Sequence, residues 1–283
     1  AHMQRAGADD APVRGVFGTG WTSVLDQCLV ARADYLVWMR EDGQHIYFPV
    51  DGEKFGPGSG MVRAEGENFW VRAVATPGDS EGVLRWEVSD NTGQRWIFTR
   101  GGAWLEVCGR EGFGVRAERD RDGLISALVS ERGRRIEVEY LDGRVVVARG
   151  WDGTRFEYLY EGEHLVGASG PHGTRRYEID DAGLVARVVA ATGVVECVNI
   201  YDDAARVVKQ TSEHGRDTRF AYLPGRVTVV SDADGSRSNT WVADSRGRTI
   251  AARDCDGNRQ TMSYDRHGNL LRSRDRDNKV TTH

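Results

Sequence analysis

From about residue 117 onward the chain repeats a unit of about twenty residues. Each unit reads as an alternating strand that ends in an aromatic residue, a turn with Asp, Gly or Asn, and a short strand rich in Val and Arg. The later strands end, at steps of 24, 21, 19 and 23 residues, at Tyr177, Tyr201, Tyr222, Trp241 and Tyr264. Because each unit holds two strands and two turns, the repetition predicts one hairpin after another.

The residue order inside a unit has the period of a strand and not of a helix. In residues 135–140, Ile136, Val138 and Tyr140 alternate with charged residues, so they share one face of a strand. Asp-Gly pairs are expected to supply the positive φ angles of two-residue hairpin turns. They lie at Asp122-Gly123, Asp142-Gly143, Asp152-Gly153, Asp234-Gly235 and Asp256-Gly257. No segment longer than about a dozen residues has helical spacing, so the sequence predicts an all-β protein of repeated antiparallel hairpins.

The first hundred-odd residues differ in composition from the rest of the chain, since they hold six of the eight tryptophans and four of the six prolines. Runs at 35–38, 44–48 and 94–98 still predict strands. We expect three regions: a tag remnant at residues 1–3, a tryptophan-rich β region at 4–112 and the hairpin repeats at 113–283. The sequence stops within a strand that begins near Lys279. We therefore expect a truncated array whose open sheet edge can pair with a second copy.

Composition excludes some classes of partner. With 38 basic and 43 acidic residues and a net charge of −5, the chain lacks the basic footprint of a nucleic-acid binder. No stretch approaches the roughly 20 apolar residues of a membrane-spanning helix. Four cysteines stand singly, which predicts four free and mostly buried thiols; they are Cys28, Cys108, Cys197 and Cys255.

No group of residues predicts a catalytic, cofactor or metal site. Asp-x-Asp clusters begin at Asp232, Asp254 and Asp275, but a calcium loop of the helix-loop-helix kind needs glycine at its sixth position, so turn formation is the preferred reading over metal binding. Isolated histidines without ligand spacing predict solvated turns; they are His164, His172 and His214. The glycine-rich segment 15–20 lacks the ending of a phosphate loop and predicts a turn before Trp21. We therefore expect no enzyme activity, with a site assembled from distant residues as the alternative.

The recurring aromatics have two possible roles. Cross-strand packing of aromatic residues on one face contributes roughly 0.2 to 1 kcal/mol per pair and fixes the register of the strands. Stacking against sugars is the alternative. The residues concerned are Phe156, Tyr158, Tyr177, Phe220, Tyr222, Trp241 and Tyr264.

The units resemble the YD repeats of the Rhs family, whose loose pattern is Tyr-Asp, two residues, Gly-Arg or Gly-Asn, then apolar residues. One copy starts at Tyr264-Asp265 and continues to Gly268-Asn269; a second starts at Tyr201-Asp202 and has Ala205 where glycine is usual. A third copy, from Trp241, is more degraded. Residues 17–21 and 41–49 look like the segment that opens the Rhs core. The same resemblance extends to the BC cocoon of toxin complexes and to the YD shell of teneurins.

The resemblance implies a curved, shell-like strip of sheet that encloses a toxic carboxy-terminal domain and helps to deliver it in interbacterial competition. It implies a bacterial protein that is made in the cytoplasm and exported. The expected partners are the remainder of the shell, the toxin domain, secretion-apparatus proteins and a second copy at the open edge. The alternative function is a secreted or surface YD-repeat module that binds carbohydrate or a partner protein. The Asp-Pro dipeptides of the family's self-cleaving segment are absent from this sequence.

Overall fold

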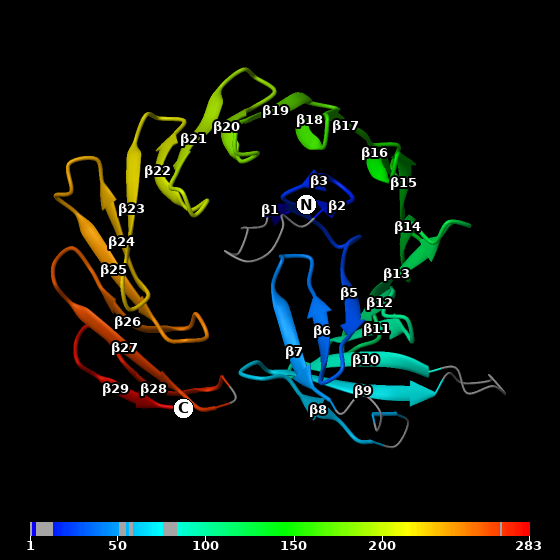
Figure 1. Ribbon diagram of the computed structural model, residues 1–283, viewed down its shortest axis with the longest axis horizontal. Helices are drawn as coiled ribbons and strands as arrows, with labels where there is room; N and C mark the ends of the chain where they lie inside the picture. The colour runs from blue at the N-terminus through cyan, green and yellow to red at the C-terminus, as the bar shows by residue number, and fades with distance from the viewer. Residues whose placement is uncertain (1, 4–13, 51–54, 57–58, 76–83, 267) are drawn as a thin grey trace. The chain divides into compact units, whose positions relative to one another are not determined.

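The computed structural model describes residues 2–3, 14–50, 55–56, 59–75, 84–266 and 268–283, and the chain divides into two compact units, residues 1–173 and 174–283. Across these described residues the secondary structure consists of strands without any helix, and every strand pair is antiparallel (Figure 1). The predicted all-β class and the hairpin repetition are confirmed. No described helix is therefore available to cross a membrane.

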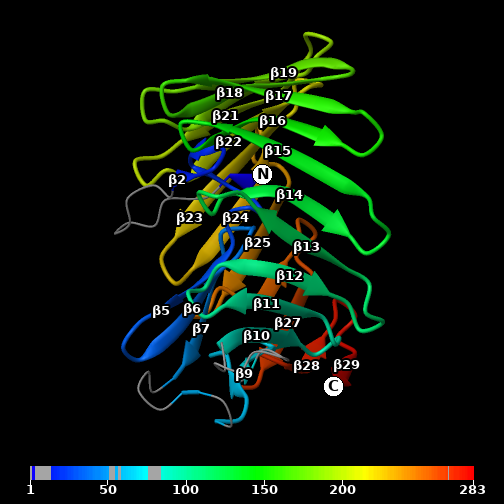
Figure 2. The same cartoon turned by 90° about the vertical axis from the view of Figure 1, so that its right-hand side faces the viewer.

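The first unit contains two main sheets. The smaller has three strands, β5 (Cys28–Ala31), β6 (Tyr35–Met39) and β7 (His45–Pro49). In the larger sheet each strand pairs with the next along the chain, and β13 to β18 lie in chain order (Figure 2). Its strands are β8 (Val62–Arg63), β9 (Phe69–Ala75), β10 (Leu84–Asp90), β11 (Arg95–Thr99), β12 (Trp104–Cys108), β13 (Gly114–Arg119), β14 (Ile125–Ser130), β15 (Arg135–Leu141), β16 (Arg144–Gly150), β17 (Arg155–Glu161) and β18 (His164–Gly170).

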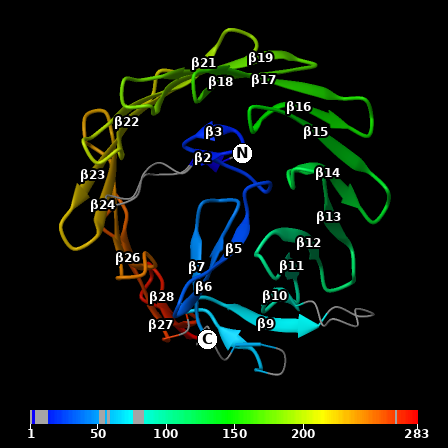
Figure 3. The same cartoon turned by 45° about the vertical axis from the view of Figure 1, so that its right-hand side comes forward.

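The hydrophobic core of the first unit lies where the three-stranded sheet packs on β9 to β12 (Figure 3). Trp38 is fully buried at its centre, with its ring centroid 4.8 Å from that of Trp96 and 5.3 Å from that of Phe69. Phe48 and Trp104 are also fully buried. Three of the six tryptophans that distinguish this part of the sequence, Trp38, Trp96 and Trp104, thus lie in its core, since large aromatic side chains bury the most apolar surface per residue.

The second unit is a single antiparallel sheet in which consecutive strands pair. Of the hydrophobic side chains described in it, just Val185 and Ala251 are buried. Its strands are β19 (Gly173–Ile179), β20 (Val185–Val189), β21 (Val195–Tyr201), β22 (Val207–Ser212), β23 (Asp217–Leu223), β24 (Val227–Asp232), β25 (Ser238–Ala243), β26 (Thr249–Arg253), β27 (Arg259–Tyr264), β28 (Leu270–Arg274) and β29 (Val280–Thr282). A sheet with so little core depends on hydrogen bonds between strands and on cross-strand side-chain pairs.

The turns correct one detail of the sequence analysis. Asp142 and Gly143 have φ of 50° and 75°, the two positive values of the predicted two-residue turn. At the other four Asp-Gly pairs, such as Asp122-Gly123, only the glycine has positive φ. There the Gly123 N–H donates to Asp120 O and the Asp120 N–H to Leu124 O, which is a three-residue loop with the glycine as a bulge. The prediction of two-residue turns was wrong at these four sites: Asp122-Gly123, Asp152-Gly153 and Asp256-Gly257 lie in three-residue loops, which need positive φ at the last position alone, and Asp234-Gly235 lies in a four-residue loop closed from Asp232 N–H to Arg237 O.

The predicted division into residues 1–3, 4–112 and 113–283 stays a prediction. Ala1 lies outside the described residues, while the backbone of β1 (His2–Met3) pairs with β4 (Trp21–Thr22). The strand expected near Lys279 is present as β29 and pairs with β28.

Candidate functional site

A hydrogen bond from a tyrosine hydroxyl to a backbone carbonyl recurs along both units. In each case the tyrosine lies at or near the end of one strand, and its hydroxyl donates to the first or second residue of the preceding strand, 15 or 16 residues earlier. The five bonds are Tyr140 to Ile125 (2.9 Å), Tyr160 to Val145 (2.7 Å), Tyr201 to Val185 (2.7 Å), Tyr222 to Val207 (2.9 Å) and Tyr264 to Thr249 (3.0 Å). Each bond ties one hairpin to the hairpin before it.

Partial burial keeps the hydroxyls of Tyr140 and Tyr160 protonated. It raises the pKa of Tyr140 to about 12, and it also raises that of Tyr160. A protonated hydroxyl is the form that can donate to a carbonyl, so burial and hydrogen bonding act together. Since the hydroxyl is already occupied within the chain, this arrangement supports the packing interpretation of the aromatics.

An aspartate organises the turn that follows the tyrosine. Asp202 Oδ1 accepts the backbone N–H groups of Ala204 (3.0 Å) and Arg206 (2.9 Å), and Asp202 N–H donates to Arg206 O. Asp244 does the same for Arg246 and Arg248. Asn and Asp side chains favour turns because they can bond to backbone groups two and more residues on. This carboxylate role explains the Asp of the Tyr-Asp pair.

The arginine at the end of the same turn reaches the next tyrosine. The Arg206 guanidinium carbon lies 4.4 Å from the ring centroid of Tyr222, and Arg248 lies 4.7 Å from that of Tyr264. Asp202 and Asp244 hold these guanidinium groups through bonds of 2.7 Å. A cation over an aromatic face is attracted to the ring by about 0.5–1 kcal/mol at exposed sites. We call the set of turn aspartate, arginine and next tyrosine the tyrosine clamp.

The two faces of the sheet differ in chemistry. The tyrosine face carries the tyrosines whose hydroxyls bond the preceding hairpin, because residues directly opposite on paired strands share a face. The opposite, charged face carries cross-strand ion pairs. In the first unit Arg135 bonds Glu118 and Arg149 bonds Glu139. In the second unit Lys209 lies 2.8 Å from Asp217.

A segment far away in sequence packs on the tyrosine face of the first unit. Val16 O accepts the N–H of Val145 (2.8 Å), and Thr19 N–H donates to Glu163 O (3.0 Å). The ring of Phe17, which is buried, meets Tyr158 edge-on with 4.8 Å between centroids. We call residues 14–26 the latch; it contains β2 (Arg14–Gly15) and β3 (Gly18–Thr19), drawn in blue in Figure 3. The predicted turn before Trp21 is therefore a docking element.

Two residues shape the latch. Gly18 has φ of +92°, and a Cβ there would lie 2.4 Å from Glu163 O, so only glycine allows the approach. Asp26 accepts the N–H of Val16 (2.7 Å) and the hydroxyl of Ser23 (2.6 Å). Burial raises the pKa of Asp26 against the opposing effect of these bonds. An apolar pocket of about 300 Å³ is lined both by the latch, through Leu25, and by the sheet, through Ile136 of β15.

The residues weighed in the sequence analysis do not assemble a reactive centre. The Asp254 and Asp275 carboxylates accept turn N–H groups, as Asp202 does, so the predicted turn role is confirmed. His172 and His214 are exposed at turns, and His164 is half-buried at the start of β18. No three His, Cys, Asp or Glu of the described residues form a group that could hold a metal ion.

All four cysteines are free, as predicted, but the expectation that most are buried was wrong: Cys28, Cys108 and Cys197 are half-buried and Cys255 is exposed. Cys197 lies on β21 of a sheet whose two faces stay partly open to solvent, so no core covers it. Burial still raises the pKa of the three half-buried thiols. A raised pKa keeps a thiol protonated and unreactive.

Comparison with family models gives two matches. The RHS Repeat model matches residues 244–280, which include the Asp244 turn and the Tyr264 clamp. This segment is an Rhs repeat. The second match, at residues 3–48, is a domain of unknown function (DUF6531), and it covers the latch and the three-stranded sheet. A comparison with curated protein sequences found no match.

Several solved structures are similar to this Rhs-repeat chain. The crystal structure of TcdB2-TccC3-Cdc42 aligns with 87% of the chain at 12% identity and a TM-score of 0.44, and a Tc holotoxin pore of Photorhabdus luminescens aligns with 87% at 12% identity and 0.37. The chain spans 14% and 18% of the length of these two structures. Because both TM-scores are below 0.5, the fold is assigned from the strands described above and not from these structures.

Proposed function

We propose that the chain is a wall segment of an Rhs-type shell that encloses a carboxy-terminal toxin domain and helps to deliver it in competition between bacteria. The observation that carries the proposal is the tyrosine hydrogen bond, which recurs along both units and joins successive hairpins. A wall needs units that bind each other in sequence, and repeat arrays bury each unit against its neighbours in this way. The match to the RHS Repeat model supports the same role.

Partners and location follow from this proposal. The wall would contact the remainder of its shell and the toxin domain, and export would involve secretion-apparatus proteins. Pairing with a second copy at a sheet edge is a further proposed contact, since an unpaired edge offers free N–H and C=O groups. The role is structural, so no enzyme activity is proposed for these residues.

Limited proteolysis of the full natural polypeptide that contains this chain tests the proposal. We expect sequence downstream of residue 283 to resist protease until denaturant opens the β-sheet. A variant with Tyr222→Ala, which weakens one clamp, should lose this protection at lower denaturant than the parent. Immediate digestion of the downstream sequence in the folded parent protein would contradict the proposal, as would unchanged protection after the wall has unfolded.

A further inference from the structure

The last strands of the second unit place four arginines on one side of the sheet. Arg253 is directly opposite Arg259, Arg274 is opposite Thr261, and Arg272 is opposite Ser263. Because opposite residues share a face and positions 259, 261 and 263 alternate along β27, all four arginines lie on the charged face. We call them the arginine cluster: Arg253, Arg259, Arg272 and Arg274. All are exposed.

The arginine cluster has no internal counter-charge. Within the part of the chain that the structure describes, none of the four guanidinium groups makes an ion pair or a side-chain hydrogen bond. The nearby carboxylates are used in turns instead. Asp254 accepts two backbone N–H groups and lies 3.2 Å from Arg276, and Asp275 accepts the N–H of Lys279.

The first unit shows how the same arrangement is neutralised elsewhere. Arg149 is directly opposite Arg155 on β16 and β17, as Arg253 is opposite Arg259. There, Arg149 bonds Glu139 and Arg155 bonds Glu157 on the same face. Like charges directly opposite on paired strands destabilise a sheet. The arginine cluster therefore lacks the carboxylates that accompany the equivalent pair.

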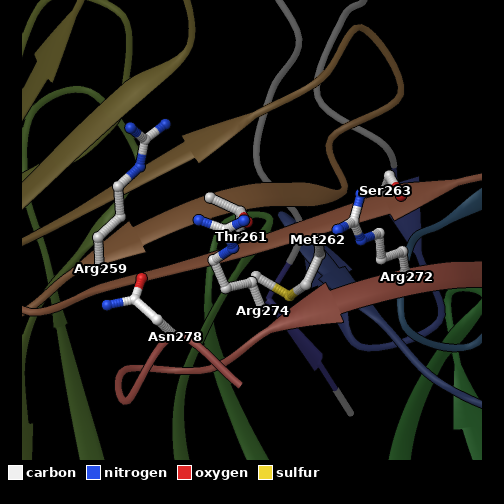
Figure 4. A pocket seen from close by; sticks show the side chains of 7 residues that line it. All are labelled: Arg259, Thr261, Met262, Ser263, Arg272, Arg274 and Asn278. Atoms are coloured by element: carbon white, nitrogen blue, oxygen red, sulfur yellow. The ribbon is translucent and has the colours of Figure 1, made fainter. Parts of the chain in front are cut away.

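The surface over the arginine cluster is hollowed. A depression of about 390 Å³ is lined by Arg259, Arg272 and Arg274 together with Thr261, Met262, Ser263 and Asn278 (Figure 4). Hydroxyl and amide groups thus stand between the guanidinium groups. Such a surface presents many hydrogen-bond donors to an anionic ligand.

We propose that the arginine cluster docks an acidic polypeptide segment in extended conformation. Arg272 and Arg274 are two residues apart on one strand, a separation of roughly 7 Å. The alternate side chains of an extended acidic segment have the same spacing, so two carboxylates can each meet one guanidinium group. The inference goes beyond the proposed function, which assigns no partner to this face.

The structure favours polypeptide over nucleic acid. Single-stranded nucleic acid binds by stacking its bases on aromatic side chains beside a basic groove. The aromatics of the last hairpins, Trp241 and Tyr264, lie on the opposite, tyrosine face. The net charge of −5 also opposes long-range attraction of a polyanion.

Fluorescence anisotropy with labelled peptides tests the inference on the full chain. The probe is a peptide of alternating Glu and Thr, with an alternating Gln and Thr peptide and a single-stranded DNA of similar length as comparisons. The variant Arg259→Gln with Arg274→Gln removes two charges of the cluster. Its matched control, Arg216→Gln with Arg237→Gln, removes two exposed turn arginines of the same unit and gives the same net charge.

We expect the Glu-Thr peptide to bind, the Gln-Thr peptide not to bind, and the cluster variant to weaken binding about tenfold, as the loss of two charge pairs allows. The control variant should change binding less than twofold, about the effect of net charge alone. Circular dichroism should show both variants folded and melting no lower than the parent, since all four substituted side chains are exposed and Arg259→Gln relieves the like charge opposite Arg253. Equal weakening in both variants, absence of peptide binding, or tighter binding of the DNA through the same arginines would each overturn the proposal.

Discussion

A tyrosine at the end of a strand has a role here that a phenylalanine cannot fill. The ring packs on the tyrosine face, and the hydroxyl of Tyr140 satisfies the Ile125 carbonyl of the hairpin before it. A buried carbonyl without a partner is costly, whereas a hydrogen bond is worth about 1 kcal/mol net. A tyrosine at this position therefore indicates a hydrogen bond to the preceding hairpin.

Replacing Tyr140 with phenylalanine tests this role. We expect the free energy of unfolding to fall by about 1–2 kcal/mol, because the variant keeps the ring and leaves the Ile125 carbonyl without its donor. Urea denaturation followed by circular dichroism measures the change. Tyr47→Phe is the control in the same unit, since Tyr47 is 45% exposed and its hydroxyl makes no described bond. Equal losses in the two variants would mean that the hydroxyl bond contributes nothing.

Ala205 is a second residue whose identity matters. Its φ is 56°, in the left-handed region, at the turn position where Gly247 and Gly268 stand in the neighbouring copies. A residue with a Cβ is strained there by roughly 1 kcal/mol. Ala205, which stands where the repeat pattern has glycine, therefore lowers the stability of the folded chain.

Ala205→Gly should raise the free energy of unfolding by about 1 kcal/mol, because glycine relieves this strain. Ala204→Gly, in the same turn at negative φ, should lower it by about half a kcal/mol through added freedom of the unfolded chain. Both are measured by urea denaturation. A stabilising effect of Ala204→Gly, or none for Ala205→Gly, would contradict this reading of the turn.

Among the elements, the latch depends on a close approach that one glycine permits. Gly18→Ala should release the latch, because its Cβ would collide with Glu163 O at 2.4 Å. We expect the amides of Thr19 and Val145 to lose protection in hydrogen exchange, since both donate in latch contacts. Gly20→Ala is the matched control: Gly20 also has positive φ, at +80°, but a Cβ there meets nothing within 4 Å. Protection should survive in that variant, and its equal loss would assign the effect to backbone strain.

The strands and turns could be predicted from the sequence because their signals are local. Alternation over 135–140 and the Asp at 202 act on residues a few positions away. The tyrosine bonds could not be predicted, since the partner carbonyl is set by the register between hairpins. A search for tyrosines 15 or 16 residues after the start of an apolar strand would have found them.

The latch was missed for a stronger reason. Val16 and Val145 are far apart in the chain, and no period within either segment indicates that they meet. The arginine cluster was also hidden, since its four members come from three strands.

At the scale of the whole molecule, hydrogen-bonded carboxylates in turns and at strand starts set the response to acid. The Arg206 side chain, with its backbone N–H, lowers the pKa of Asp202, and Lys209 with Thr211 lowers that of Asp217. Because both pKa values are lower in the folded state, the stabilisation is present above the unfolded value near 3.8 and is lost as the pH falls through the folded pKa. We expect the unfolding midpoint in urea to drop between about pH 4 and pH 2.5.

The variant Asp202→Asn with Asp217→Asn should flatten this pH dependence and lower stability at pH 7. Asp203→Asn, in the same turn and without a described side-chain bond, is the control and should keep the parent's slope. If the double variant loses stability with acid as steeply as the parent, other groups carry the acid response.

The pairing of each strand with its neighbour in sequence also sets an order of assembly during synthesis. A strand such as β22 finds its partner β21 already made, so hairpins can add to the sheet as they leave the ribosome, and short sequence separations favour fast folding. The latch is the exception. Its partners, on β16 and in the turn before β18, are made well over a hundred residues after it, so the latch cannot dock until those later strands have been synthesised.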